Sequence, residues 1–136
     1  MNVTREGSVP QRTVFVIEDE ILIRMTVAEH LRGCGYKVIE AADADEALLV
    51  LQSPDVQIDI VFSDIEMPGA MDGFALSTWL RRNRPEIIII LTGTVPRAAD
   101  SVAALCDDGP IPKPYEPQHV ADRIRRLIGA REAHRK

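Results

Sequence analysis

Acidic residues directly follow predicted strands in two distant parts of the chain. Glu18, Asp19 and Glu20 come after the apolar run "TVFVI", and Asp64 comes after "QIDIVFS". A carboxylate placed next to a hydrophobic core is costly unless something binds it. The positions of these acids therefore point to a binding site rather than to a solvated surface.

Two other polar side chains follow later apolar runs. Thr92 comes after "EIIIIL", and Lys113 comes just after "GPI". If these residues meet the acids in space, the set contains a carboxylate nucleophile, a hydroxyl donor and a fixed cation. Phosphoryl transfer onto an aspartate needs these groups, together with a metal that neutralises phosphoryl oxygens.

If these carboxylates converge, they also predict a bound metal ion and its identity. Two unit charges about 4 Å apart repel by roughly 4 kcal/mol at an effective dielectric constant of 20. A hard divalent cation relieves this repulsion, and an oxygen-only, partly hydrated set of ligands suits Mg²⁺. We therefore expect Mg²⁺, for which Mn²⁺ could substitute.

The segments that must position these residues alternate between two kinds. Short apolar or β-branched runs predict strands, and runs with helical spacing or capping residues follow them. Asp43 with Glu46 three residues later is a capping-box pattern, and Asp72 can cap the following helix. The first helix is expected to bury a stripe of Ile21, Met25, Ala28 and Leu31. Strands are expected at residues 13–17, 36–41, 57–63, 86–91 and 109–111, and helices near 21–33, 43–53, 72–84, 96–108 and from 117 onward.

This alternation predicts an α/β fold with a five-stranded parallel sheet covered on both faces. The right-handed crossover rule leaves few arrangements, of which the doubly wound order 2-1-3-4-5 is the common one for five strands. Sites in such sheets gather beyond the carboxyl ends of the strands. The acids, Thr92 and Lys113 all stand at those ends, so we expect them to form one pocket.

Length and charge limit the classes of function. The 136 residues make one domain, for which we expect a lead-in at 1–12, the domain at 13–129 and a short basic tail at 130–136. The net charge is −5 although residues 123–136 hold six Arg or Lys against one Glu. An acidic body argues against direct DNA binding. No apolar run is long enough to cross a membrane, and two widely spaced cysteines without a secretory signal favour a cytoplasmic protein.

The motifs at the strand ends resemble those of response-regulator receiver domains of two-component signalling. They are "VFVIEDE" at the first strand, "DIVFSDIEMPGAMDG" at the third, "IIIILTG" at the fourth and "IPKPY" at the fifth. The resemblance covers nearly everything from Thr13 to Gly129 and implies the flavodoxin-like (βα)5 fold.

The resemblance also implies a role for each site residue. Asp64 would accept a phosphoryl group from a histidine kinase or a phosphotransfer protein. Thr92 would be the switch hydroxyl and Lys113 the site lysine, with the Lys113–Pro114 peptide cis. The metal would be held by Glu18 and Asp19 as the acidic pair, by Asp64, and by the backbone carbonyl of Glu66.

Two features depart from the family pattern. The loop "MPGAMDG" has one residue more than the usual "MPGMDG", which should change only the shape of the loop. Receivers usually carry an aromatic residue three positions before the site lysine, where this chain has Pro110. Tyr115 is the nearest substitute, although we interpret it as a partly buried packing residue. Any switching should then involve the loop after Thr92 and the helix after Pro96.

The expected output is docking to an unknown downstream protein or onward transfer of the phosphoryl group, by a monomer or weak dimer. We expect no output domain, and no enzymatic activity beyond Mg²⁺-dependent self-phosphorylation and slow autodephosphorylation. One alternative is a haloacid-dehalogenase-like phosphohydrolase, because "DIE" at 64–66 loosely resembles its Asp-x-Asp motif. Another is a receiver-like binding module that is never phosphorylated. A flavodoxin-like cofactor protein is the weakest alternative, since carboxylates at the strand ends would repel a cofactor phosphate.

Overall fold

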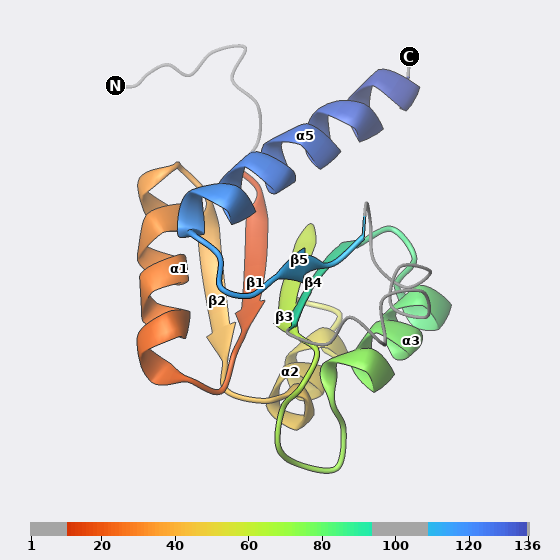
Figure 1. Cartoon of the computed structure of the whole chain (residues 1–136). Coiled ribbons are helices and arrows are strands. Elements are labelled where there is room, and N and C mark those ends of the chain that lie inside the picture. Colours follow the sequence, from red (N-terminus) through yellow and green to blue (C-terminus); the bar gives the residue numbers. More distant parts are fainter. Residues whose placement is uncertain (1–10, 94–108, 136) are drawn as a thin grey trace.

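The computed structural model describes residues 11–93 and 109–135, and its strands and helices alternate along the chain (Figure 1). The helix expected at 96–108 lies outside the described residues. The elements, in chain order, are β1 (Thr13–Ile17), α1 (Ile21–Gly33), β2 (Lys37–Ala41), α2 (Ala44–Leu51), β3 (Ile60–Asp64), α3 (Gly73–Asn83), β4 (Ile88–Gly93), β5 (Ile111–Pro112) and α5 (Pro117–Arg135).

The five strands form one parallel sheet in the order β2-β1-β3-β4-β5, as the sequence predicts. In the centre of the sheet Phe15 pairs with Val61, and Val61 pairs with Ile89. Because all strands run the same way, their carboxyl ends lie along one edge of the sheet. The fold therefore brings the ends of β1, β3, β4 and β5 side by side.

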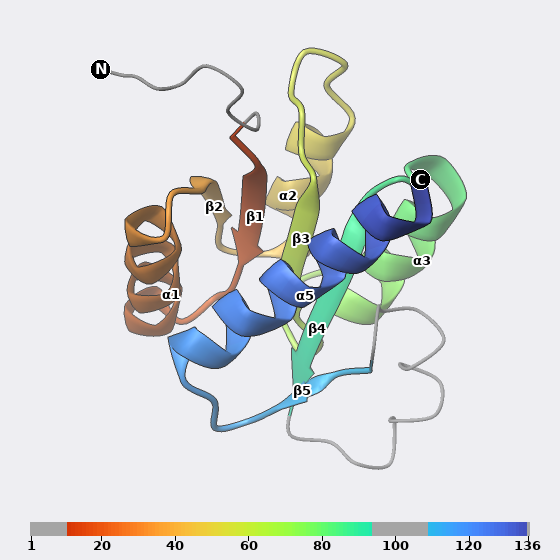
Figure 2. The same cartoon turned by 90° about the horizontal axis from the view of Figure 1, so that it is seen from above.

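Helices cover both faces of the sheet, with α1 and α5 on one face and α2 and α3 on the other (Figures 1 and 2). Alternate residues of β1 pack on the two faces of the sheet, because successive side chains of a strand point to opposite sides. Val14 and Val16 pack in the core under α1 and α5. Phe15 and Ile17 pack in the core under α2 and α3. None of the helices in the described ranges is long and apolar enough to cross a bilayer.

The expected buried stripe of α1 is wrong in its first half. Ile21 and Met25 are 58% and 51% exposed, whereas Val27, Ala28 and Leu31 are buried. Ile23, rather than Ile21, packs against the core in the first half of the helix. The predicted helix is present, but it is rotated so that residues 23, 27 and 31 face the sheet.

The predicted helix caps are confirmed. The Asp43 side chain accepts a hydrogen bond from the Glu46 N–H at 2.8 Å, and the Glu46 carboxylate accepts one from the Ala42 N–H at 2.6 Å. The Asp72 side chain accepts a hydrogen bond from the Ala75 N–H at 2.9 Å. This second cap fixes where α3 starts, directly after the loop that follows β3.

β1 has the expected bounds, and the boundaries of the other strands differ from the expected ones by up to three residues. β3 and β4 begin later than expected and extend through Asp64 and Gly93, so the expected site residues Asp64 and Thr92 lie within paired strands. They are direct register partners across the two strands. Backbone pairing continues through polar residues because the ladder does not depend on side-chain hydropathy.

The last helix continues past residue 129. α5 extends to Arg135, so residues 130–135 are helical where a tail was expected. Two arginines connect this part of the helix to the segments that precede β4 and β1, at the amino ends of the strands. Arg131 donates a hydrogen bond to the Glu86 carbonyl, and Arg12 forms an ion pair with Glu132.

Candidate functional site

Three carboxylates and one ammonium meet at the carboxyl edge of the sheet. Glu18 and Asp19 follow β1, Asp64 ends β3 and Lys113 follows β5. One oxygen from each of Glu18, Asp19 and Asp64 lies within 4.8 Å of the others. The Lys113 Nζ lies 2.6 Å from Asp64 Oδ2 and 4.0 Å from Glu18 Oε1.

Burial and the neighbouring charges shift the pKa values of Glu18 and Lys113. Glu18 and Asp64 are only 1% and 4% exposed, whereas Asp19 faces solvent. Burial is the main reason that the pKa of Glu18 rises to about 7, and the negative charge of Asp64 adds to the rise. Burial acts to lower the pKa of Lys113, but its hydrogen bond to Asp64 and the surrounding carboxylates raise that pKa above its ordinary value. The ammonium therefore stays charged.

The donor set fits a hard divalent cation. The three clustered ligand atoms are all carboxylate oxygens, as Mg²⁺ prefers. Glu18 Oε1 is buried and has no hydrogen-bond partner among the described residues. One ammonium next to three carboxylates leaves a net negative charge, which a bound cation would neutralise. Glu18, Asp19 and Asp64 are thus the residues that could hold the metal.

The backbone after Asp64 holds the second oxygen of its carboxylate. The Glu66 N–H donates a hydrogen bond to Asp64 Oδ1 at 3.1 Å, and the Glu66 side chain is exposed. With Lys113 on Oδ2, both oxygens of Asp64 accept a hydrogen bond. With a donor on each oxygen, the carboxylate of Asp64 is held in a fixed orientation at the edge of the sheet.

Thr92 lies next to Asp64, but its hydroxyl is bound elsewhere. The side chain is fully buried, and its Oγ1 donates a hydrogen bond of 2.8 Å to the carbonyl of Ile111 in β5. The expected switch hydroxyl is therefore bonded to the neighbouring strand. The sequence placed Thr92 at the right edge of the sheet, but it could not indicate this partner.

A glycine that the sequence reasoning missed lies against the backbone of Asp64. A Cβ built on Gly73 would lie 2.1 Å from the Asp64 carbonyl oxygen, closer than any real contact. The Gly73 N–H also donates a hydrogen bond to the Ile65 carbonyl at 3.0 Å. Only a residue without a Cβ lets the first turn of α3 pack this closely on the end of β3. The available signal was a glycine directly after the capping residue Asp72.

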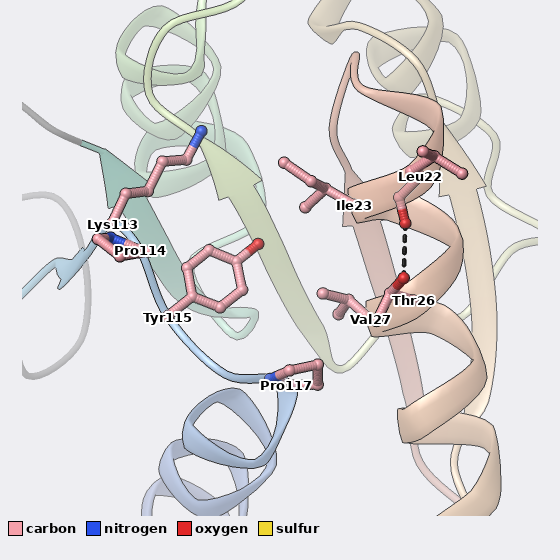
Figure 3. Close-up of a pocket in the computed structure, with 8 residues that line it drawn as sticks. All are labelled: Leu22, Ile23, Thr26, Val27, Lys113, Pro114, Tyr115 and Pro117. Carbon is pink, nitrogen blue, oxygen red and sulfur yellow. Dashed lines mark hydrogen bonds between the residues drawn. The ribbon is translucent and has the colours of Figure 1, made fainter.

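The segment after β5 carries Tyr115 next to the site. The Lys113–Pro114 peptide is cis, as the resemblance implies. Tyr115 is partly buried, and its ring packs edge-on against Phe62 with the ring centroids 5.6 Å apart. This confirms the interpretation of Tyr115 as a packing residue. Together with α1, this segment lines an apolar cavity of about 560 Å³, with Lys113 at one end (Figure 3).

Comparisons with known proteins match most of the chain. The family model described as the response regulator receiver domain matches residues 14–125. The chain is 36% identical over 118 residues to the sensor kinase CckA of Brucella abortus, which covers 85% of this chain and 12% of that protein. It is 36% identical over 122 residues to the transcriptional regulatory protein PdtaR of Mycobacterium tuberculosis, which covers 88% of this chain and 56% of that protein. The chain thus spans about half or less of the length of these relatives.

Solved structures share the fold. The chemotaxis response regulator CheY4 of Vibrio cholerae matches with a TM-score of 0.75 and 28% identity, covering 87% of this chain and 99% of that one. The response regulator TrrA of Thermotoga maritima, solved in complex with Mg²⁺-BeF, matches with a TM-score of 0.74 and 24% identity, covering 86% of this chain and 99% of that one.

Proposed function

The chain belongs to the response regulator receiver domain family, and we propose that Asp64 is the residue that accepts the phosphoryl group. The observation that carries this proposal is the position of Lys113, whose ammonium lies 2.6 Å from Asp64 Oδ2, within a cluster that also contains Glu18 and Asp19. A nucleophilic carboxylate, a fixed cation and a set of metal ligands are what phosphoryl transfer to an aspartate requires.

In the proposed reaction, a carboxylate oxygen of Asp64 attacks the phosphorus of a phosphohistidine. The new bond joins that oxygen to phosphorus, the P–N bond breaks, and the imidazole nitrogen takes up a proton. Lys113 is positioned to stay close to the transferred group and to offset its charge. The Glu66 N–H keeps the other oxygen of the carboxylate in place.

A divalent cation would be held by Glu18, Asp19 and Asp64, and we include the Glu66 backbone carbonyl in this ligand set. When bound, the cation supplies positive charge that lowers the cost of bringing phosphoryl oxygens close to several carboxylates. Mg²⁺ suits this oxygen-only set, and the solved TrrA structure of the same fold contains Mg²⁺. The chain's own residues therefore orient the acceptor and leave a place for the cation.

The proposed response to phosphorylation begins at Thr92. Its hydroxyl donates to the Ile111 carbonyl in the unphosphorylated chain, and an Asp64 phosphoryl group would offer a charged acceptor on the neighbouring strand. Exchanging one acceptor for the other would release a bond that holds β5. The altered surface would then bind a downstream protein with changed affinity; a coupling of about 1–3 kcal/mol corresponds to a change of roughly 5- to 150-fold.

The test is intact-protein mass spectrometry after treatment with a small phosphodonor such as acetyl phosphate, with and without Mg²⁺. We expect one phosphoryl group, added only with Mg²⁺ and removed by hydroxylamine, which cleaves acyl phosphates. Asp64→Asn should abolish the addition, whereas the control Asp55→Asn, in an exposed loop, should leave it unchanged. Phosphorylation of the Asp64→Asn variant would refute the assignment, and no phosphorylation of the parent chain would favour a receiver-like binding module.

A further inference from the structure

Two buried side-chain oxygens lack a hydrogen-bond partner among the described residues: Glu18 Oε1 and the Tyr115 hydroxyl. They are complementary in chemistry, because a carboxylate only accepts hydrogen bonds and a phenol can donate one. A buried polar group without a partner destabilises the folded chain. A bond between these two atoms would remove both costs at once.

Tyr115 lies next to the acidic site, two residues after Lys113. Its ring is held edge-on by Phe62, which precedes Asp64 by two residues in β3. Figure 3 shows the hydroxyl pointing into the space between Lys113 and α1. Burial raises the pKa of Tyr115, and the negative charges of Glu18 and Asp64 raise it further, so the hydroxyl lies within the field of both carboxylates.

One oxygen of the Glu18 carboxylate has a donor and the other has none among the described residues. Its Oε2 accepts a hydrogen bond from the Glu20 N–H at 3.1 Å. Its Oε1 lies 4.0 Å from the Lys113 ammonium, which is too far for a hydrogen bond, and that ammonium is bonded to Asp64. A cation at the site would contact Glu18, so the direction of this carboxylate matters for binding, and a second donor on Oε1 would fix that direction.

We propose that Tyr115 is a positioning residue of the cation site: its hydroxyl donates a hydrogen bond to Glu18 Oε1 when the cation is bound. The bond would orient the Glu18 carboxylate toward the cation. This inference rests on the proposed function, since it assumes that the acidic cluster holds a divalent cation. It gives Tyr115 a polar role beyond packing, and that role differs from the role of an aromatic residue at position 110.

The first test measures Mg²⁺ affinity by isothermal titration calorimetry for Tyr115→Phe, which keeps the ring and removes only the hydroxyl. We expect binding about 3- to 10-fold weaker, the effect of losing one hydrogen bond to a ligand of the metal. The unfolding midpoint of the metal-free variant should stay the same or rise, because the hydroxyl has no partner there among the described residues. A purely structural role would instead lower that midpoint. The control is Tyr36→Phe, because Tyr36 packs on the same core but does not line the cavity of Figure 3.

A double-mutant cycle tests whether Tyr115 acts through Glu18. Glu18→Asp keeps the charge but shortens the side chain, so Tyr115→Phe should have no further effect on Mg²⁺ affinity in that background. An unchanged affinity in the single Tyr115→Phe variant, or an equal loss in both backgrounds, would overturn the proposal. Failure of the parent chain to bind Mg²⁺ would overturn the metal site itself, whereas Mg²⁺ binding without Asp64 phosphorylation would count only against the proposed function.

Discussion

Lys113 and a bound cation would share the negative charge of one carboxylate, because the lysine ammonium lies 2.6 Å from Oδ2 of Asp64. The salt bridge is mostly buried, since the Asp64 side chain is 5% exposed and that of Lys113 is 22% exposed. In such surroundings a charge is weakly screened. The lysine therefore stabilises the site without metal and competes with the metal for the same charge.

Replacing Lys113 should separate these two effects. Lys113→Ala is expected to bind Mg²⁺ about 10-fold more tightly, because one competing positive charge is gone. The same variant should accept a phosphoryl group at least about 100-fold more slowly, because a fixed cation next to the transferred group is lost. Calorimetry and timed mass spectrometry measure the two quantities. Lys37→Ala, at the exposed start of β2, is the control, and weaker Mg²⁺ binding by Lys113→Ala would contradict the competition.

The stability of the metal-free protein should fall between about pH 5 and pH 8. The pKa of Glu18 is about 7 in the folded chain against 4.5 for the ordinary group, so the fold favours the protonated form. That contribution is complete at acidic pH and disappears as the pH rises through 7. Its size is up to about 3 kcal/mol at 1.36 kcal/mol per pKa unit. Urea unfolding across this range measures it.

Two changes should remove that pH dependence. Saturating Mg²⁺ should abolish it, because the cation stabilises the ionised Glu18 carboxylate. Glu18→Gln should also abolish it, because the amide does not titrate. Lys113 does not interfere in this range, since its pKa is raised from an ordinary value of 10.5. A metal-free parent chain whose stability rose steadily from pH 5 to pH 8 would contradict the assignment to Glu18.

We expect Thr92 to affect the stability of the chain and its response to phosphorylation, but not the transfer of the phosphoryl group to Asp64. Thr92→Val removes the donor to the Ile111 carbonyl and should destabilise the chain by about 1–3 kcal/mol, because a buried acceptor loses its partner. Phosphorylation of Asp64 should persist. In the parent chain, phosphorylation should speed amide exchange at Ile111 and Lys113, and in Thr92→Val exchange should be fast with or without phosphate. Thr92→Ser, which keeps the hydroxyl, should behave like the parent.

Gly73 should be intolerant of any side chain. Gly73→Ala forces a methyl group to 2.1 Å from the Asp64 carbonyl oxygen, so the start of α3 or the end of β3 must move. We expect a loss of about 1–3 kcal/mol in stability and slower phosphorylation of Asp64. Gly33→Ala is the matched control, since its Cβ would meet nothing within 4 Å at the end of α1. Equal behaviour of the two variants would show that the close approach does not matter.

The order of the strands and the residues at their carboxyl ends could be predicted from sequence because they follow from local patterns and one topological rule. Asp64 and Thr92 come after strongly apolar runs, and parallel strands must end at one edge. The rotation of α1 could not be predicted in the same way. Both Ile21 and Ile23 are apolar, so the sequence offers two nearly equivalent stripes, and only packing on the sheet selects one.

Contacts that depend on the direction of a side chain could not be predicted from the sequence either. The Thr92 hydroxyl had a phosphate as its expected partner, and its bond to Ile111 becomes visible only when β4 and β5 are placed side by side. The position of the Tyr115 hydroxyl and the close approach of Gly73 to Asp64 are likewise three-dimensional. The expected helix at 96–108 lies outside the described residues.

Pro110, just before β5, and Pro112, within it, have a consequence for how this molecule can associate. β5 is an outer strand of the sheet, and the Lys113 N–H points inward to the Gly93 carbonyl. Backbone groups alternate in direction along a strand, so positions 110 and 112 present their nitrogens outward. Both are proline and have no hydrogen to donate, so another strand cannot extend the sheet here by the usual ladder. The border formed by β5 is therefore poorly suited to edge-to-edge strand pairing, the kind of contact through which exposed sheet edges aggregate.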